Sequence, residues 1–285
     1  MKPLLGAHMS ISGGLEKALL RGRALECTTI QIFTKNATTW RERTLDGDEI
    51  SLFRTTAREQ GIDPVVAHNS YLVNLASPEE DLYEKSLRAM FHELVRCEQL
   101  GIGDIVIHPG AHRGKGIACG VARIAAALNR LFSETKGFSV RIILEMTAGQ
   151  GTVIGCRPEH MAMIVERVHE QSRVGFCLDT CHVFAAGYDI DHAGGWDAFL
   201  EEVNDRLGLE RMRVMHLNDS LRECGSRVDR HKDIGKGMIG EKLFQAIMTD
   251  RRFQAIPKII ETPKENDHTN LNLLREYAKS RDVPR

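Results

Sequence analysis

Two short segments of this 285-residue sequence carry histidine and acidic residues at spacings that suit metal binding. Asp179 and His182 lie three residues apart, directly after an apolar run. Asp229 and His231 are separated by one residue, so an extended segment would turn both side chains to the same side. Imidazole and carboxylate ligands suit zinc, with manganese or iron as alternatives, and such metals activate water. The two segments therefore predict a metal-dependent hydrolase.

Short β-rich runs alternate with longer helical patterns along the whole chain. The runs cover residues 4–7, 29–33, 64–67, 104–107, 141–144, 174–178, 213–215 and 258–260. The helical patterns cover residues 15–26, 50–60, 78–100, 118–135, 158–170, 198–207, 242–248 and 271–279. Alternating strands and helices imply βαβ units and a parallel sheet. Eight such units predict an α/β fold, a single closed (β/α)8 barrel over residues 1–285.

Seven of the eight runs are followed by a residue that can bind a metal or exchange a proton. These residues are His8, His68, His108, Glu145, Asp179, His216 and Glu261. The second run ends instead at Thr34 and Lys35. In a barrel, the carboxyl ends of all strands face one mouth, so these side chains are expected to converge there.

Together with the two segments above, the strand ends supply more ligands than one tetrahedral metal site needs. A multinuclear cluster with a bridging carboxylate uses them better. The nine predicted ligands are His68, His108, Glu145, Asp179, His182, His216, Asp229, His231 and Glu261.

Several other residues near the expected mouth have roles that the sequence leaves open. His8 and His112 either support a ligand or contact the substrate. Cys181 lies between two predicted ligands and is expected to pack in the core. The glycine-rich turn at residues 148–151 either cradles a phosphate or simply connects a strand to a helix, and it lacks the Lys-Ser/Thr of a P-loop.

The composition, with 42% hydrophobic and 27% charged residues, is ordinary for a soluble globular protein. A net charge of -1 gives no general signature of polyanion binding, although it leaves room for one local basic face. The seven cysteines are odd in number and scattered, which predicts reduced thiols in a cytoplasmic protein. We find neither a signal peptide nor an apolar stretch of membrane-spanning length, so no membrane association is expected.

Several segments resemble the signature segments of the endonuclease IV family. They are His108-Pro109-Gly110, Leu178-Asp179-Thr180-Cys181-His182, His216-Leu217-Asn218-Asp219, Gly225-Ser226-Arg227-Val228-Asp229-Arg230-His231 and Ile234-Gly235-Lys236-Gly237. The resemblance runs from Gly6 to Thr262, which is most of the chain.

This resemblance implies a TIM barrel that holds three zinc ions, with manganese possible at one site. The nine predicted ligands would then divide into His68, His108 and Glu145 for the first zinc, Glu145, Asp179, His216 and Glu261 for the second, and His182, Asp229 and His231 for the third. Glu145 would bridge two zinc ions and act as the catalytic residue that orients the attacking water.

The resemblance also implies the substrate, which is double-stranded DNA with an abasic site. Cleavage on the 5′ side of the lesion would leave a 3′-hydroxyl and a 5′-deoxyribose phosphate, with trimming of 3′ ends as a side activity. The implied DNA contacts are a wedge of Tyr71 and Leu72 together with Lys35, Asn36, Arg227 and Arg230. Thr38 and Met146 depart from the residues expected in this family, a basic residue and an asparagine.

Two alternatives compete with this interpretation. A metal-dependent sugar isomerase or epimerase would use a similar barrel, but it gives no role to Asp229 and His231 as a third site or to Tyr71 and Leu72 as a wedge. A binding-only module explains the ligands but not a bridged cluster in an open mouth. We expect a monomer without a protein partner.

Overall fold

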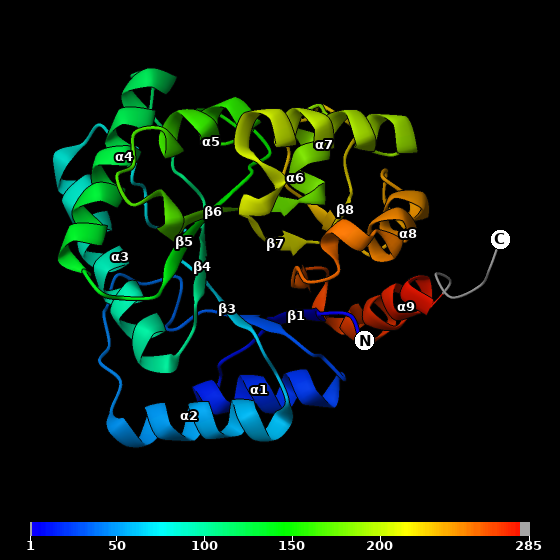
Figure 1. The fold of residues 1–285 in the computed structure, drawn as a ribbon, viewed down its shortest axis with the longest axis horizontal. Helices are drawn as coiled ribbons and strands as arrows, with labels where there is room; N and C mark the ends of the chain where they lie inside the picture. Colours follow the sequence, from blue (N-terminus) through cyan, green and yellow to red (C-terminus); the bar gives the residue numbers. More distant parts are fainter. Residues whose placement is uncertain (1, 280–285) are drawn as a thin grey trace.

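The computed structural model describes residues 2–279, in which a closed barrel of parallel strands lies inside a ring of helices (Figure 1). The barrel strands are β1 (Leu5–Met9), β2 (Ile30–Ile32), β3 (Val65–His68), β4 (Asp104–Ile107), β5 (Arg141–Glu145), β6 (Val174–Asp179), β7 (Met212–His216) and β10 (Lys258–Ile260). Neighbouring strands follow the chain order, and β10 pairs in parallel with both β7 and β1 to close the sheet. The predicted (β/α)8 barrel is confirmed.

The helices surround the barrel, with α1 and α2 on one side and α5 and α7 on the opposite side (Figure 1). Their bounds are α1 (Leu15–Ala24), α2 (Gly47–Gln60), α3 (Glu80–Leu100), α4 (Ile117–Glu134), α5 (Pro158–Val165), α6 (Thr180–Ala185), α7 (Ala193–Leu207), α8 (Glu241–Thr249) and α9 (Asp267–Lys279). Local signals fix several of the ends. The Asp46 carboxylate caps α2 by accepting a hydrogen bond from the Glu49 N–H, and Gly101 ends α3 in the left-handed conformation.

Several helices differ from the sequence predictions; α7 and α9, for example, begin at Ala193 and Asp267, before the predicted starts at residues 198 and 271. The helix α5 ends at Val165, well before the predicted end at residue 170. The sequence pattern does not predict α6, because six residues are too few to show a helical period. This short helix begins where the Asp179 carboxylate accepts a hydrogen bond from the His182 N–H at 2.9 Å.

Small apolar side chains fill the barrel one layer below its mouth. Six of them form a separate, fully buried cluster, which consists of Val66, Val106, Ile143, Cys177, Val214 and Ile259. Strand side chains alternate between two sides, so the residue two positions later points the same way. In all six strands that later residue is a histidine or an acidic residue. The apolar cluster is therefore the floor beneath a polar layer at the mouth.

A two-stranded antiparallel sheet, formed by β8 (Asp219–Ser220) and β9 (His231–Lys232), follows β7. The buried Asp219 carboxylate anchors it by accepting hydrogen bonds from the backbone N–H groups of Gly237 and Ile239, each at 2.9 Å. His231 Nδ1 lies 3.2 Å from the Glu261 carbonyl oxygen just past β10. The small sheet thus carries His231 to the barrel mouth.

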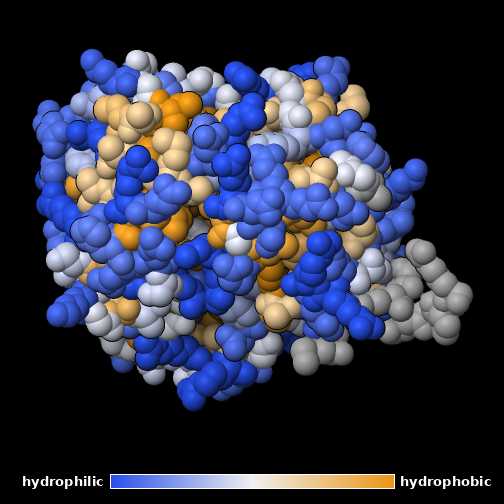
Figure 2. All heavy atoms as spheres, turned by 45° about the horizontal axis from the view of Figure 1, so that its top comes forward, coloured by the Kyte–Doolittle hydropathy of each residue, from blue (hydrophilic) through white to orange (hydrophobic). Residues whose placement is uncertain are grey.

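Hydrophilic residues cover most of the face seen in Figure 2, and hydrophobic residues lie between them in smaller patches. Among the exposed large hydrophobic side chains of the described residues, Tyr71 in the loop after β3 is the most exposed, at 64%. Among the helices of residues 2–279, none is long and apolar enough to cross a membrane. A single exposed aromatic side chain next to the polar mouth is a feature that a binding function would explain.

Candidate metal centre

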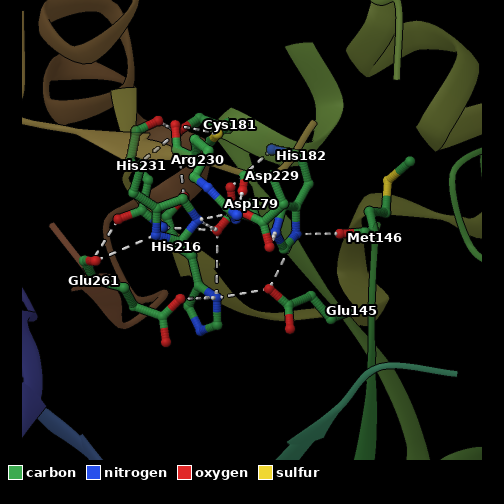
Figure 3. Close-up of polar contacts among 12 residues, drawn as sticks. Glu145, Met146, Asp179, Cys181, His182, His216, Asp229, Arg230, His231 and Glu261 are labelled. Atoms are coloured by element: carbon green, nitrogen blue, oxygen red, sulfur yellow. Dashed lines mark hydrogen bonds and ion pairs between the residues drawn. The ribbon is translucent and has the colours of Figure 1, made fainter. Parts of the chain in front are cut away.

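Glu145, at the end of β5, lies in the middle of the polar layer and is fully buried. Its Oε2 lies 3.1 Å from His68 Nε2 and 3.0 Å from His108 Nε2. Its Oε1 lies 2.9 Å from His216 Nδ1 and 3.4 Å from His182 Nδ1. Figure 3 shows Glu145 pointing toward the His182 and His216 side of the cluster. One carboxylate therefore links imidazoles from four separate parts of the barrel.

Two more carboxylates approach His216 from the other side. Its Nδ1 lies 3.4 Å from Glu261 Oε2 and 3.7 Å from Asp179 Oδ2. Asp179 is also fixed by Asn218, whose amide nitrogen donates to Asp179 Oδ2 at 2.7 Å. The buried His216 imidazole is thus surrounded by three acidic side chains.

A third group forms where the β8–β9 segment meets α6. Asp229 Oδ2 lies 3.1 Å from His182 Nε2, and Asp229 Oδ1 lies 3.2 Å from His231 Nε2. His231 Nε2 also lies 3.7 Å from Asp179 Oδ2, which connects this group to the previous one. The predicted orientation of Asp229 and His231 toward the same side is confirmed.

The structure thus brings all nine predicted ligands together. In each of three groups, the potential ligand atoms lie within 4.8 Å of one another. The groups are His68, His108 and Glu145; Glu145, Asp179, His216 and Glu261; and His182, Asp229 and His231. Spacings of this size leave room for one cation in the centre of each group.

Four of the imidazoles hold their outer nitrogen against an oxygen that can only accept a hydrogen bond. The pairs are His68 Nδ1 with Asn69 O at 2.8 Å, His182 Nδ1 with Met146 O at 2.9 Å, His216 Nε2 with Gln31 Oε1 at 2.8 Å and His231 Nδ1 with Glu261 O at 3.2 Å. Each outer nitrogen therefore carries a hydrogen, and each inner nitrogen can present a lone pair to the carboxylates. Lone pairs facing carboxylates repel unless a cation or proton lies between them. The donor set therefore fits metal ions.

The pKa values of these groups express the same charge arrangement. Burial alone would raise the pKa of the Glu145 carboxyl, but the imidazoles of His108 and His216 hold it well below its usual range. Burial opposes protonation of His231, yet Asp179 and Asp229 raise its pKa to about 9. The cluster thus attracts positive charge, which a metal ion can supply in place of protons.

Comparison with known proteins identifies the family of this chain. The family described as xylose isomerase-like TIM barrel matches residues 20–283. A protein from Chloroflexus aggregans named probable endonuclease 4 is 47% identical over 281 residues, which is 97% of this chain and 98% of that protein. Its namesake from Geotalea daltonii is 46% identical over 285 residues, covering 99% of this chain and 100% of that protein.

A solved structure points to the same family as these relatives. The crystal structure of endonuclease IV from Thermus thermophilus matches with a TM-score of 0.88 and 36% identity, over 98% of this chain and 100% of that chain. This chain belongs to the endonuclease IV family. A D-tagatose 3-epimerase-like protein matches with a TM-score of 0.75 at 16% identity, which shows a common fold alone.

In this endonuclease IV family member, several residues predicted to contact DNA lie at the surface beside the metal-binding groups. Tyr71 is exposed, and its ring centre lies 5.6 Å from that of His68 and 5.9 Å from that of His108. Leu72 is half-buried next to it, while Arg227 and Arg230 are both exposed near the half-buried Asp229. These positions are compatible with the predicted contacts.

The loop after β2 differs from the sequence-based expectation. Lys35 is only 3% exposed, and its ammonium group donates to the Thr39 carbonyl oxygen at 2.6 Å and lies 3.6 Å from Glu42. The Lys35 ammonium group thus makes its contacts inside the loop and not at the surface, and its predicted contact with DNA stays a prediction. Asn36 is exposed, and its side-chain oxygen accepts from the Thr38 N–H at 2.9 Å, which shapes the loop tip.

The prediction of ligands at strand ends misses one buried polar residue of this endonuclease IV family member. Gln31, in β2, is fully buried and contacts His216, Glu261 and His8. The sequence feature that could have revealed this residue is a glutamine between two isoleucines in an apolar run. His8 has the supporting position that was one of its two predicted roles, since its Nδ1 lies 3.5 Å from Glu261 Oε1.

The remaining open residues have local roles. His112 Nδ1 accepts a hydrogen bond from the Gly116 N–H at 3.0 Å within its own loop. Cys181 is buried, as predicted, with its sulfur 3.7 Å from the Arg230 carbonyl oxygen. The Met146 side chain is buried in the core, and its backbone oxygen orients His182, so an asparagine is not needed for this contact.

Proposed function

We propose that this protein is a zinc-dependent endonuclease that hydrolyses the phosphodiester on the 5′ side of abasic sites in double-stranded DNA. The products would be a 3′-hydroxyl and a 5′-deoxyribose phosphate. The main support is the orientation of the imidazoles, whose inner nitrogens face four carboxylates in three adjoining groups. The names of relatives at 46–47% identity support the substrate.

Each group would hold one zinc ion, and manganese would replace zinc at one of them. The donor set of imidazole and carboxylate suits either ion. Bound zinc would lower the pKa of water to near neutrality and neutralise the charge of the phosphate. Glu145 belongs to two groups and faces imidazoles with both oxygens, so it is the residue placed to bridge them and to orient the attacking water.

The exposed residues at the mouth would recognise the lesion. An abasic nucleotide has no base to read, and pulling it out of the helix costs least where pairing and stacking are already lost. Tyr71 and Leu72 would fill the gap that is left in the duplex, because an aromatic ring can stack on the neighbouring bases. Arg227 and Arg230 would bind backbone phosphates, and Asn36 would contact the DNA from the loop after β2.

The test is cleavage of an end-labelled duplex that carries one abasic site, with an intact duplex as control. We expect a single cut 5′ to the lesion, no cut in the control, loss of activity after chelation and its recovery with added zinc. The protein should carry about three zinc ions, as the three groups imply. A protein that retains its zinc but leaves the abasic duplex intact would contradict the proposed substrate and favour a small sugar.

A further inference from the structure

We propose that Gln31 is a positioning residue that orients His216 and Glu261 and thereby sets the affinity of one of the three metal sites. The inference rests on the metal cluster of the proposed function, but its test is metal binding and not DNA cleavage. Gln31 comes from β2, the strand that ends in Thr34 and Lys35 and not in a predicted ligand. Its side chain is fully buried under the mouth.

The Gln31 side-chain amide makes three polar contacts, two with predicted metal ligands and one with His8 beside them. Its Nε2 lies 2.7 Å from Glu261 Oε1 and 3.0 Å from His8 Nδ1. Its Oε1 lies 2.8 Å from His216 Nε2. A single amide group therefore joins two predicted metal ligands and the histidine beside them.

The chemistry of these partners fixes the direction of each hydrogen bond. An ionised Glu261 carboxylate only accepts, so the amide nitrogen of Gln31 must face it, and the amide oxygen must face His216. His216 therefore carries its hydrogen on Nε2 and presents the lone pair of Nδ1 to the carboxylates. With the amide turned over, oxygen would face oxygen at Glu261, and that contact would be repulsive.

The same bonds select one oxygen of Glu261 as the ligand. Oε1 is occupied by Gln31, whereas Oε2 lies 3.4 Å from His216 Nδ1, inside the group of Glu145, Asp179, His216 and Glu261. Both ligand atoms are thus aimed at one point by one buried side chain. Positioning of this kind preorganises a metal site and raises its affinity.

The other two groups are oriented differently. His68 and His182 donate to the backbone carbonyl oxygens of Asn69 and Met146. His231 is likewise oriented by the backbone oxygen of residue 261. A change of the Gln31 side chain therefore acts directly on one group and leaves the backbone contacts of the other two in place.

The experiment compares zinc binding by the wild-type apo-protein and by Gln31→Met, which keeps the size of the side chain but not its hydrogen bonds. Zinc is titrated against a coloured chelator, and cobalt absorption reports the geometry of each site. We expect one of three ions to bind about 10- to 100-fold more weakly, which is the effect of removing a residue that orients a metal ligand. The cobalt spectrum should change for that ion only.

Thr29→Val is the matched control. Thr29 is fully buried two residues earlier on the same chain segment, and its hydroxyl donates to the Pro64 carbonyl oxygen at 2.6 Å. This variant loses one buried hydrogen bond near β2 without touching the cluster, so it should bind zinc like the wild type. Equal loss of zinc in both variants would mean that β2 had been damaged, and it would overturn the proposal.

A measurement on the wild-type protein keeps the proposal testable if Gln31→Met does not fold. Long-range nitrogen–proton NMR should show His216 protonated on Nε2 in the zinc-loaded protein, and protonation on Nδ1 would overturn the proposal. Wild-type affinity for all three ions in a folded Gln31→Met would do the same. Three bound ions without cleavage of abasic DNA would contradict only the proposed function.

Discussion

Two buried clusters of charged side chains lie close to the barrel mouth, and they differ in charge balance. The first consists of the nine candidate metal ligands and is here called the metal-binding cluster; its four carboxylates form ion pairs with imidazoles. The second, here called the Arg96 cluster, consists of Thr34, Lys35, Glu42, Glu93 and Arg96. It contains two acidic and two basic residues, so its charges cancel without an added ion.

The contacts of the Arg96 cluster stabilise the fold, because they hold the loop after β2 against a helix. The Arg96 guanidinium lies 2.7 Å from both Glu93 and Glu42, and its Nε donates to the Thr34 hydroxyl at 2.8 Å. Glu93 also accepts a hydrogen bond from the Thr34 hydroxyl. Arg96 and Glu93 lie on α3, so this helix anchors the loop after β2.

The anchored loop in turn supports the side of the mouth that carries Tyr71 and is proposed to recognise the lesion, here called the recognition side. The Ser70 hydroxyl donates to the Ala37 carbonyl oxygen at 2.5 Å and so links the loop after β2 to the loop that carries Tyr71. One buried cluster thus holds surface loops in place, while the other has an excess of negative charge that metal ions would balance. Buried charge alone does not identify a catalytic site, but unbalanced buried charge does point to one.

The largest expected effect comes from Glu145→Gln in the metal-binding cluster. The amide cannot bridge two cations, and its NH₂ group would face an imidazole nitrogen. If the transition state loses several kcal/mol of stabilisation, kcat should fall on the order of 10³-fold or more. Single-turnover cleavage of the abasic duplex measures this, together with zinc content and DNA affinity, which should stay closer to normal than turnover. Near-normal turnover would remove Glu145 from the mechanism.

The same chemical change in the Arg96 cluster should affect folding and not chemistry. Glu93→Gln leaves the buried Arg96 with one carboxylate partner, and breaking a buried pair costs roughly 3 kcal/mol of unfolding free energy. Urea unfolding of the chelated protein measures this cost. Zinc content should be unchanged. Loss of zinc in this variant would show that the two clusters are coupled and would break the distinction between them.

Glu84→Gln provides the matched control on the same helix. Glu84 pairs with Arg130 at 2.7 Å, but this pair is far more accessible to solvent than the Glu93–Arg96 pair, because Glu84 is 32% and Arg130 is 48% exposed. An exposed pair contributes about 0–1 kcal/mol, so this variant should unfold almost like the wild type. The difference between the two variants then isolates the effect of burial on an ion pair.

Tyr71→Ala tests the recognition side separately from both clusters. Stacking of a base on an aromatic ring is worth about 1–3 kcal/mol, so affinity for the abasic duplex should fall about tenfold. The zinc content should not change, because Tyr71 is exposed and is not among the nine predicted ligands. Leu52→Ala, on the outer face of α2 at 50% exposure, is the control. A loss of zinc in Tyr71→Ala would contradict the assigned role of this loop.

The sequence predicts the metal-binding cluster well because its ligands obey local rules. Each barrel strand points alternate side chains inward and all strands end at the same mouth, so a ligand that continues the inward series at a strand end faces the mouth. This holds for His68 above Val66 and for Glu145 above Ile143. The register of the strands does not need to be known for the argument, since every strand ends on the same side.

Residues whose roles depend on distant partners could not be predicted in this way. The sequence predicts that Lys35 lies at the surface, because its burial depends on Glu42 and on a helix that follows much later in the chain. Gln31 could have been found by counting inward positions on β2, but not from the residue that follows the strand. The β8–β9 sheet depends on the Asp219 carboxylate, which binds backbone groups of residues 237 and 239.

Asp267 provides the smallest test, because it is a buried carboxylate whose charge is only partly balanced. It is 5% exposed, its Oδ2 lies 3.6 Å from Lys264, and its Oδ1 has no hydrogen-bond partner within residues 2–279. Burial raises the pKa of Asp267 to about 6 from an ordinary value of 3.8. The folded protein therefore holds a proton between these two pH values that the unfolded chain has released.

The free energy of unfolding should therefore fall as the pH rises from about 4 to about 6, and the loss is complete at neutral pH. Asp267→Asn removes this loss but also gives up a favourable negative charge at the start of α9. We expect a net gain of about 1 kcal/mol at pH 7 and little difference at pH 4, measured by urea unfolding of the chelated protein at both pH values. A variant that is less stable at pH 7 would show that Lys264 balances Asp267 fully. This carboxylate would then belong with the balanced Arg96 cluster.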